Sequence, residues 1–403
     1  MRVGIRNARK TGAAAALAAT AALILSACGG SASDTASSAA SAAVSAAASA
    51  AASTAASAAP ASSAAAAASA LDPNADLTKQ TLTVSNWAGY YPEDLAKQFQ
   101  TAVGTPLTIA NHATNEEIMG KLTAGGDSGI DVAFVSGQYA QALNDAGLLE
   151  PIDKSLIPNI TNLYPEATQL AFDKGNTYSV PYTWGTTGIC YRSDLVDKAP
   201  TSWNDLLKPT DANKGKITML STERWLLLPA LKSLGYSINT TDDAQLQEAK
   251  DLTIAQKPDL LAYDDTDFYK KLISGEATMT EAWDGWCNYG IAEDKNIKFV
   301  VPSEGSDLWS DTMVVLKSSK NKEASMAFIN FILDPANHAW VAENILYKVP
   351  NQAAMETKGV TDLNATYPNM AMTPADLLKQ ETIVDLGADS SKYTDIATEV
   401  TSS

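Results

Sequence analysis

The stretch LTVSNWAGYYPEDLAKQFQTAVGTPLTIANHATNEEIMGKLTAGGDSGIDVAFVS, residues 82–136, decides the fold. Runs typical of strands open it, recur at residues 107–110 and close it at residues 130–135. Between the first two runs, Pro92 is followed by two acidic residues, which is typical of a helix start because acidic side chains suit the positive end of the helix dipole. Strands that alternate with helices at this spacing predict an α/β fold with a mainly parallel sheet.

The same alternation continues along the chain. Residues 178–191 form a β-rich segment, and no internal repeat is present. At this length the region after the first 70 residues is expected to form one large domain or two lobes. Further strands are expected at 217–220, 277–283, 298–301 and 313–316, and helices at 225–234 and 324–333.

The N-terminus has the pattern of a secretory signal peptide. Four basic residues lie within the first ten, an apolar stretch covers residues 13–25, and Leu-Ser-Ala precedes Cys28. The apolar stretch is too short for a membrane-spanning helix, which needs ~20 residues. The sequence around Cys28 resembles the bacterial lipobox, so we expect residues 1–27 to be removed and Cys28 to be lipidated. The alternative is an ordinary signal peptide that contains a cysteine.

Residues 28–75 begin with that cysteine and consist largely of Ala and Ser. This segment has no alternating apolar face with which to build a core, so we expect it to act as a tether. The protein would then be extracytoplasmic and anchored by Cys28 to the outer face of the cytoplasmic membrane, in the periplasmic space or at the cell surface.

The chain is acidic, with a formal net charge of −17. The signal peptide carries four positive charges and no negative ones, so the exported form would be more acidic still. This balance opposes nucleic-acid binding, which depends on Lys and Arg contacts to phosphates, and it suits a cationic ligand.

Two cysteines and two histidines remain beyond Cys28. Cys190 and Cys287 either form a disulfide, as exported proteins allow, or remain two buried free thiols. His112 and His338 lie in no metal-binding or catalytic-triad motif. We therefore expect no catalytic residues, no metal and no cofactor, although an exported hydrolase that uses carboxylates distant in sequence stays an alternative.

Seven stretches, in order, resemble the bacterial spermidine/putrescine-binding protein family of ABC transporter extracellular solute-binding lipoproteins. They are Asn86-Trp87, residues 178–188, 201–206 and 234–237, Trp309-Ser310-Asp311, residues 329–333 and Val349-Pro350-Asn351. The resemblance implies a two-lobed periplasmic-binding-protein fold, with strands that cross between the lobes and a ligand cleft at their interface. Lobe one would comprise residues 79–186 and 310–356, and lobe two residues 187–309 and 357–400.

The resemblance also implies where the ligand binds. Six residues match family positions: two aromatic residues of a first-lobe loop, a serine at a strand end, the tryptophan under the ligand's methylene chain, and an aromatic residue with the carboxylate that meets an amino group. In that order they are Trp87 and Tyr90, Ser136, Trp283, Trp309 and Asp311. An alkylammonium needs an apolar wall, ring faces and a fixed carboxylate, so the chemistry agrees with this assignment.

The chain departs from the family pattern at the acidic positions. Gly89 stands where the family has an acid beside the first tryptophan, and Thr222 and Trp225 stand where it has two acids at the start of a helix. Of four expected carboxylates, only Asp311 is clearly retained.

Two acids near the lost positions are expected to replace them as ligand-binding residues. These are Glu223 and Asp284, while Trp225 and Trp286 are expected to line or shrink the same region. The changes favour a ligand smaller than spermidine, and putrescine, a monoamine, a quaternary ammonium and an amino acid with a distal amine all stay open. Arg224 could receive a carboxylate, which leaves an amino-acid-like zwitterion open.

The sequence therefore predicts the extracellular solute-binding component of an ABC importer, without enzymatic activity. It is expected to act as a monomer that captures a small cationic amine, a polyamine such as putrescine or spermidine, and delivers it to the membrane permease. A binder of a quaternary ammonium or a zwitterion is the alternative. A purely structural or adhesive surface lipoprotein would leave the aromatic residues unexplained.

Overall fold

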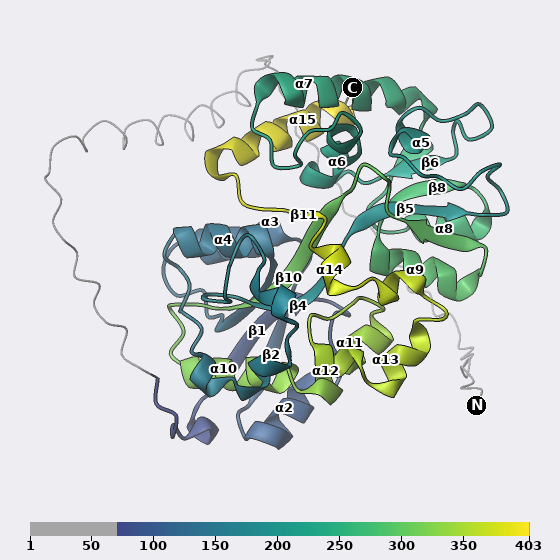
Figure 1. Ribbon diagram of the computed structural model, residues 1–403. Coiled ribbons are helices and arrows are strands. Elements are labelled where there is room, and N and C mark those ends of the chain that lie inside the picture. The colour runs from purple at the N-terminus through teal and green to yellow at the C-terminus, as the bar shows by residue number, and fades with distance from the viewer. Residues whose placement is uncertain (1–70, 403) are drawn as a thin grey trace, which may run out of the picture. The chain divides into compact units, whose positions relative to one another are not determined.

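Residues 71–402 are described by the structure, a computed structural model (Figure 1). The expected signal peptide (1–27), the expected lipidation site Cys28 and all but the end of the expected tether (28–75) lie outside the described residues. Within residues 71–402, no helix combines the length and the apolar character that crossing a membrane requires.

The first sheet has six strands and contains the stretch that opens the fold. β1 (Leu82–Trp87) lies between β2 (Leu107–His112) and β3 (Val132–Ser136) and runs parallel to both. β10 (Asp307–Val315) pairs antiparallel with β3, and β4 (Val180–Gly185) and β11 (Glu381–Thr382) pair with β10. The expected parallel core is present, but the sheet is mixed because β10 enters it in the opposite direction.

The second sheet has five strands in the order β7-β6-β8-β5-β9. β6 is parallel to β7 and β8, whereas β5 is antiparallel to β8 and β9. The two sheets, each with its own helices, confirm the predicted two-lobed α/β fold. We call the parts of the chain built mainly on the first and second sheets the first and second lobes. The strands are β5 (Thr187–Arg192), β6 (Ile217–Met219), β7 (Ala262–Tyr263), β8 (Met279–Trp283) and β9 (Ile297–Val300).

Helices pack against both sheets, and Figure 1 shows α6, α7 and α15 together beside the second sheet and α2 and α10 beside the first. The earlier helices are α2 (Leu95–Val103), α3 (Asn115–Thr123), α4 (Gly137–Asp145), α5 (Asn204–Leu207), α6 (Glu223–Ser233) and α7 (Asp243–Gln256). The later ones are α8 (Phe268–Ser274), α9 (Asp284–Glu293), α10 (Lys322–Ile332), α11 (Pro335–Asn344), α12 (Gln352–Met355), α13 (Lys358–Leu363), α14 (Pro374–Leu377) and α15 (Ser390–Ser402).

β3 shows why its sequence is an unbroken apolar run. Val132 and Phe134 pack into the main hydrophobic core, while Ala133 and Val135 pack into a second core with residues of α3 and α4. Because successive side chains of a strand point to opposite faces, a strand covered on both sides needs apolar residues at every position.

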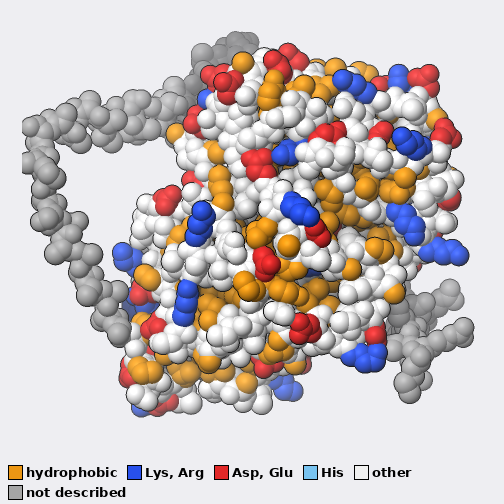
Figure 2. All heavy atoms as spheres, in the orientation of Figure 1, with side chains coloured by type: hydrophobic (Ala, Val, Ile, Leu, Met, Phe, Trp, Pro, Cys, Tyr) orange, Lys and Arg blue, Asp and Glu red, His pale blue; other side chains and the backbone are white. Residues whose placement is uncertain are grey.

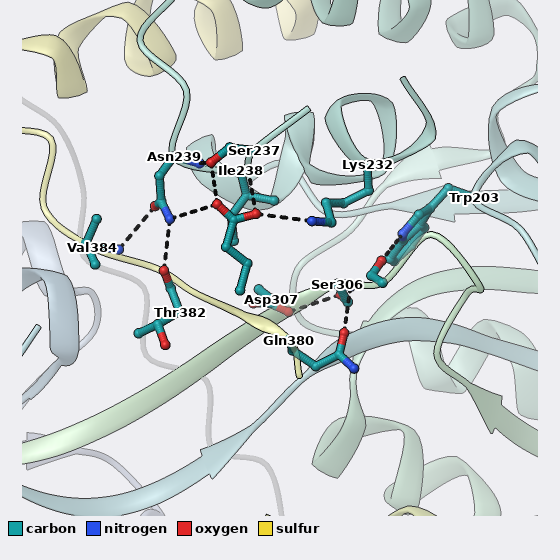
Figure 3. Close-up of polar contacts among 12 residues, drawn as sticks. Trp203, Lys232, Ser237, Ile238, Asn239, Ser306, Asp307, Gln380, Thr382 and Val384 are labelled. Atoms are coloured by element: carbon teal, nitrogen blue, oxygen red, sulfur yellow. Dashed lines mark hydrogen bonds and ion pairs between the residues drawn. The ribbon is translucent and has the colours of Figure 1, made fainter. Parts of the chain in front are cut away.

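The chain passes from the first sheet to the second through Thr186 and returns through residues 301–306. Only Thr186 separates β4 from β5. The returning segment is fixed to the outgoing one, because the Ser306 hydroxyl donates to the Thr187 carbonyl oxygen at 2.7 Å. The indole N–H of Trp203, a buried residue of the second lobe, donates to the backbone of the same segment at 2.9 Å (Figure 3).

A further passage between the sheets runs through β11. The Glu381 carboxylate accepts hydrogen bonds from four second-lobe residues: Lys232 (3.1 Å), Ser237, the Ile238 amide (3.1 Å) and Asn239 (3.2 Å) (Figure 3). Its neighbour Gln380 accepts a hydrogen bond from the Ser306 amide at 2.8 Å. These contacts hold the C-terminal segment beside the point where the chain changes sheets.

The structure shows whether the two cysteines beyond Cys28 are paired, and it changes the bounds of one expected strand. Cys190 on β5 and Cys287 on α9 form a disulfide, with Cα atoms 5.8 Å apart. The strand expected at 313–316 begins earlier, at Asp307. Its polar residues Ser310, Asp311 and Thr312 stay in the strand because side-chain and backbone groups of β3 and β4 satisfy them, so Asp311 lies within the strand and not in a loop before it.

Candidate functional site

Asp311 lies inside β10, between two other strands of the first lobe. Its Cα is paired with Ser136 of β3 on one side and with Thr183 of β4 on the other. Side chains at paired positions of neighbouring strands project to the same face of the sheet. The register of the sheet therefore brings one carboxylate and two hydroxyl groups together.

Hydroxyl groups hold the Asp311 carboxylate in place. Ser136 donates to its Oδ1 at 2.7 Å and Tyr90 to its Oδ2 at 2.9 Å. The Thr183 hydroxyl lies 2.7 Å from the Tyr90 oxygen and 3.5 Å from Oδ2 of Asp311, so both of these oxygens are within reach of its one proton. Asn115 donates to the Ser136 oxygen at 3.1 Å, which leaves the Ser136 proton for Asp311.

Asp311 forms no ion pair with any basic side chain of residues 71–402; its contacts are the neutral hydroxyls of Ser136, Tyr90 and Thr183. Burial raises the pKa of the Asp311 carboxyl above its usual value, and the hydrogen bonds from the three hydroxyls oppose the rise. A carboxylate that is fixed, largely desolvated and without a counter-ion is suited to accept a cation.

Aromatic rings lie around this carboxylate. The ring of Tyr90 lies 5.7 Å from Trp87 and 6.2 Å from Tyr347, and Tyr347 lies 5.0 Å from Trp309, all with edge-to-face geometry. The buried indole N–H of Trp309 has no hydrogen-bond partner among the described residues, so it is available to a ligand. We call Tyr90, Ser136, Thr183, Trp309, Asp311 and Tyr347 the Asp311 site.

Because Gly185 has no side chain, a carboxylate of the second lobe can lie next to the Asp311 site. It pairs with Trp309 between β4 and β10. A Cβ at Gly185 would lie 2.4 Å from Cζ2 of Trp309 and 2.4 Å from Oδ1 of Asp284, which is the first residue of α9. The missing side chain allows the ring and the second-lobe carboxylate to meet over the backbone where the chain changes sheets.

Trp225 and Trp283 form a pair in the second lobe, with ring centroids 5.6 Å apart. Trp283 ends β8 opposite Thr187, and the indole N–H of Trp225 donates to Oδ2 of Asp307 at 2.8 Å. Burial raises the pKa of Asp307 to about 6, and hydrogen bonds from Thr187 and Trp225 oppose the rise. The resemblance implies an acidic residue at position 225. The tryptophan found there instead donates its indole N–H to an acidic residue, Asp307.

Asp284 pairs with an internal cation. The Lys348 ammonium donates to its Oδ2, and the side chains of Asp284 and Lys348 are 1% and 3% exposed. Burial raises the pKa of the Asp284 carboxyl and the Lys348 charge opposes this. Asp284 lies beside Trp309, as expected of a ligand-binding residue, but the Lys348 ammonium already neutralises its charge.

Glu223 lies apart from the other candidates. It forms no hydrogen bond or ion pair with any of them, and burial raises the pKa of its carboxyl. It borders a hollow of about 420 Å³ on the side covered by α15, lined by Ser221, Glu223, Tyr263, Thr394, Ala397, Thr398 and Thr401.

Arg224 and Trp286 are engaged elsewhere in the second lobe. The Arg224 guanidinium donates to the carbonyl oxygens of Val384 and Ile238 and to Asn239, and it lies 4.7 Å from the Tyr393 ring centroid. Trp286 packs among the rings of Phe268, Tyr269 and Tyr289. Both side chains therefore have structural roles.

Four residues that the sequence did not single out belong to this region: Thr183, Asp307, Tyr347 and Lys348. Thr183 lies within the quoted segment 178–188, and Lys348 directly precedes Val349-Pro350-Asn351. Their neighbourhood was visible in the sequence, but their roles depend on strand register and on a contact between lobes, which no local pattern gives.

Figure 2 shows acidic and basic side chains interspersed over the visible face, without a broad basic field. Among residues 71–402, no three His, Cys, Asp or Glu side chains are placed to hold a metal ion.

The chain matches known proteins over most of its length. Residues 94–371 match the family described as bacterial extracellular solute-binding protein. The spermidine/putrescine-binding periplasmic protein of Escherichia coli is 33% identical over 317 residues, which cover 78% of this chain and 89% of that protein.

Solved structures agree. The spermidine/putrescine ABC transporter substrate-binding protein PotD of Streptococcus pneumoniae has 32% identity and a TM-score of 0.69, covering 80% of this chain and 99% of that one. The TpPotD lipoprotein of Treponema pallidum has 26% identity and a TM-score of 0.72, with the same coverage. The chain therefore belongs to the family of bacterial extracellular solute-binding proteins.

Proposed function

We propose that this protein captures a small aliphatic amine of the polyamine class at the Asp311 site and delivers it to the permease of an ABC importer, without chemical change. The observation that carries the proposal is the Asp311 carboxylate, which three neutral hydroxyls hold in place and which no basic side chain of residues 71–402 neutralises. The names of the relatives, which bind spermidine and putrescine, support the same ligand class.

The residues around Asp311 suit the parts of such a ligand. An ammonium group donates to the carboxylate, and a charge-assisted hydrogen bond of this kind contributes about 1.5–3 kcal/mol. The rings of Tyr90, Trp309 and Tyr347 offer faces and edges to the methylene chain and to the cation, and each cation–ring contact contributes ~1–2 kcal/mol when desolvated. Trp87, Trp225 and Trp283 would extend the apolar wall from the two lobes.

Two lobes joined by short crossings suit capture by closure. We propose lobe boundaries at 79–186 with 310–356 and at 187–309 with 357–400, since Thr186 joins the sheets. Rotation about this joint would bring the Trp225 and Trp283 side of the second lobe toward Asp311, and the closed form would be the one that the permease recognises.

The proposed location is outside the cytoplasmic membrane, as for the periplasmic relatives. Cys28 would carry the lipid and residues 28–75 would connect it to the lobes, and the naming of one relative as a lipoprotein supports this arrangement. The protein would act as a monomer.

Isothermal titration calorimetry of the purified protein against putrescine, spermidine, choline, betaine and γ-aminobutyrate tests the proposal. An amine of the polyamine class should bind with 1:1 stoichiometry and raise the melting temperature, because a ligand that binds only the folded state stabilises it. Binding of betaine alone, or of none of the five, would contradict the proposal. An assay for release of a product from the bound amine separates capture from catalysis.

A further inference from the structure

Lys348 and Asp284 form a buried ion pair between segments far apart in sequence. Lys348 lies between α11 and α12, and its carbonyl oxygen accepts a hydrogen bond from the Trp184 amide of β4 at 3.2 Å. Asp284 begins α9 in the second lobe, and its amide donates to the Thr186 carbonyl oxygen at 3.2 Å. The pair therefore lies where the chain changes sheets.

The pair is next to the Asp311 site. Gly185 brings the Asp284 carboxylate and the Trp309 ring to the same point, since a Cβ there would lie 2.4 Å from both. Tyr347, the residue before Lys348, contacts Trp309 edge to face. A ligand that lies along Trp309 and Tyr347 from Asp311 would reach Asp284 next.

The carboxylates of Asp311 and Asp284 differ in whether a positive charge neutralises them. Asp311 has only hydroxyl partners, whereas Asp284 has an ammonium partner, and the Lys348 ammonium also donates to the Asn369 carbonyl oxygen at 3.2 Å. The side-chain amide of Asn369 donates to the Asp284 carbonyl oxygen at 2.8 Å, so the pair is fixed from both ends.

Asp307 does not offer a replacement. It is fully buried, and its two carboxylate oxygens already accept hydrogen bonds, Oδ1 from the Thr187 amide at 2.7 Å and Oδ2 from the Trp225 indole at 2.8 Å. A second ligand ammonium beside Trp309 would thus meet the Lys348 charge without a free carboxylate, and burying an unpaired cation beside a like charge is costly.

We propose that Lys348 is a specificity-determining residue: its ammonium occupies the carboxylate that a second ligand ammonium would need, so the Asp311 site takes an amine with one ammonium group and an uncharged far end. This inference rests on the proposed function and narrows it, because among amines of the polyamine class it selects those in which only one nitrogen is charged.

Putrescine and N-acetylputrescine test the inference, since they share a four-carbon chain and differ in one charge. By calorimetry, the wild-type protein should bind N-acetylputrescine at least about tenfold more tightly than putrescine. Lys348→Met frees Asp284 and should reverse this preference. The double variant Asp284→Asn/Lys348→Met should gain no affinity for putrescine, because the freed carboxylate is absent.

Lys348→Met leaves a buried carboxylate without a partner. If that variant does not fold, Lys348→Gln keeps a donor to Asp284 without the charge and should shift the ratio in the same direction. Equal or tighter binding of putrescine to the wild type, with a ratio unchanged in the Lys348 variants, would overturn the inference and leave amine capture intact. Binding of neither ligand to the wild type would overturn both.

Discussion

Replacing Asp311 with Asn is expected to weaken amine binding and to stabilise the unliganded protein. The amide keeps the shape of the carboxylate and can still bond Ser136 and Tyr90 if their hydroxyl protons reorient. What is lost is the charge that meets the ligand ammonium. A hydrogen bond to a charged group contributes about 1.5–3 kcal/mol, which corresponds to about a 10- to 150-fold rise in Kd.

The stabilisation follows from the direction of the pKa shift. Because burial raises the pKa of the Asp311 carboxyl, the folded state binds a proton more tightly than the unfolded chain does, and its stability falls as the pH rises through that range. Asn cannot ionise, so the melting temperature of unliganded Asp311→Asn should exceed that of the wild type at neutral pH.

Calorimetry with the tightest-binding amine of the panel measures the first effect, and thermal melts without and with ligand measure the second. Asp197→Asn, at an exposed carboxylate far along the chain from Asp311, is the matched control and should change neither. Lowering the pH should weaken amine binding in the wild type and leave the residual binding of Asp311→Asn unaffected. An unchanged Kd in Asp311→Asn would refute the assignment of this residue to the ligand.

Three further changes have expected outcomes. Trp283→Ala should raise the Kd for the amine by about 3- to 30-fold in calorimetry through loss of a ring contact, while Trp340→Ala should not; equal effects would remove Trp283 from the ligand. Burial lowers the pKa of His338 to about 4, so only the unfolded chain gains a proton between pH 6.5 and 4. In chemical denaturation, the free energy of unfolding should keep its full value above pH 6.5 and fall by up to about 3 kcal/mol toward pH 4. His338→Gln should show a smaller fall over the same range. Identical pH profiles for the two proteins would contradict the assignment of this fall to His338. Replacing both Cys190 and Cys287 with Ala opens a loop with a sequence separation of 97 and should cost about 2–5 kcal/mol in the same assay, whereas a variant as stable as the wild type would show that the disulfide contributes little.

The fold was predictable where the pattern is local. The runs at 82–87, 107–112 and 132–136 carry apolar residues at strand spacing, and the structure places strands there. β10 was predicted only from residue 313, because its first half is polar. Those polar groups are satisfied by residues distant in sequence: Ser310 and Asp311 by groups of β4 and β3, and Asp307 by Thr187 and Trp225. The local pattern could therefore not reveal a strand.

The composition of the Asp311 site was only partly predictable. Resemblance to a family supplied Tyr90, Ser136, Trp309 and Asp311, and the structure brings these four together. The state of Asp284 could not be predicted, because it depends on Lys348, which is 64 residues away along the chain. A carboxylate near a lost position looks the same in sequence whether it is free or already paired.

Crystallographic analysis of the protein with its tightest-binding amine tests the central claim most directly. The account predicts the ligand nitrogen at about 2.7–2.9 Å from an Asp311 carboxylate oxygen, with its carbon chain against the rings of Trp309 and Tyr347. An amine bound in the hollow beside Glu223, with Asp311 still held only by hydroxyls, would contradict it.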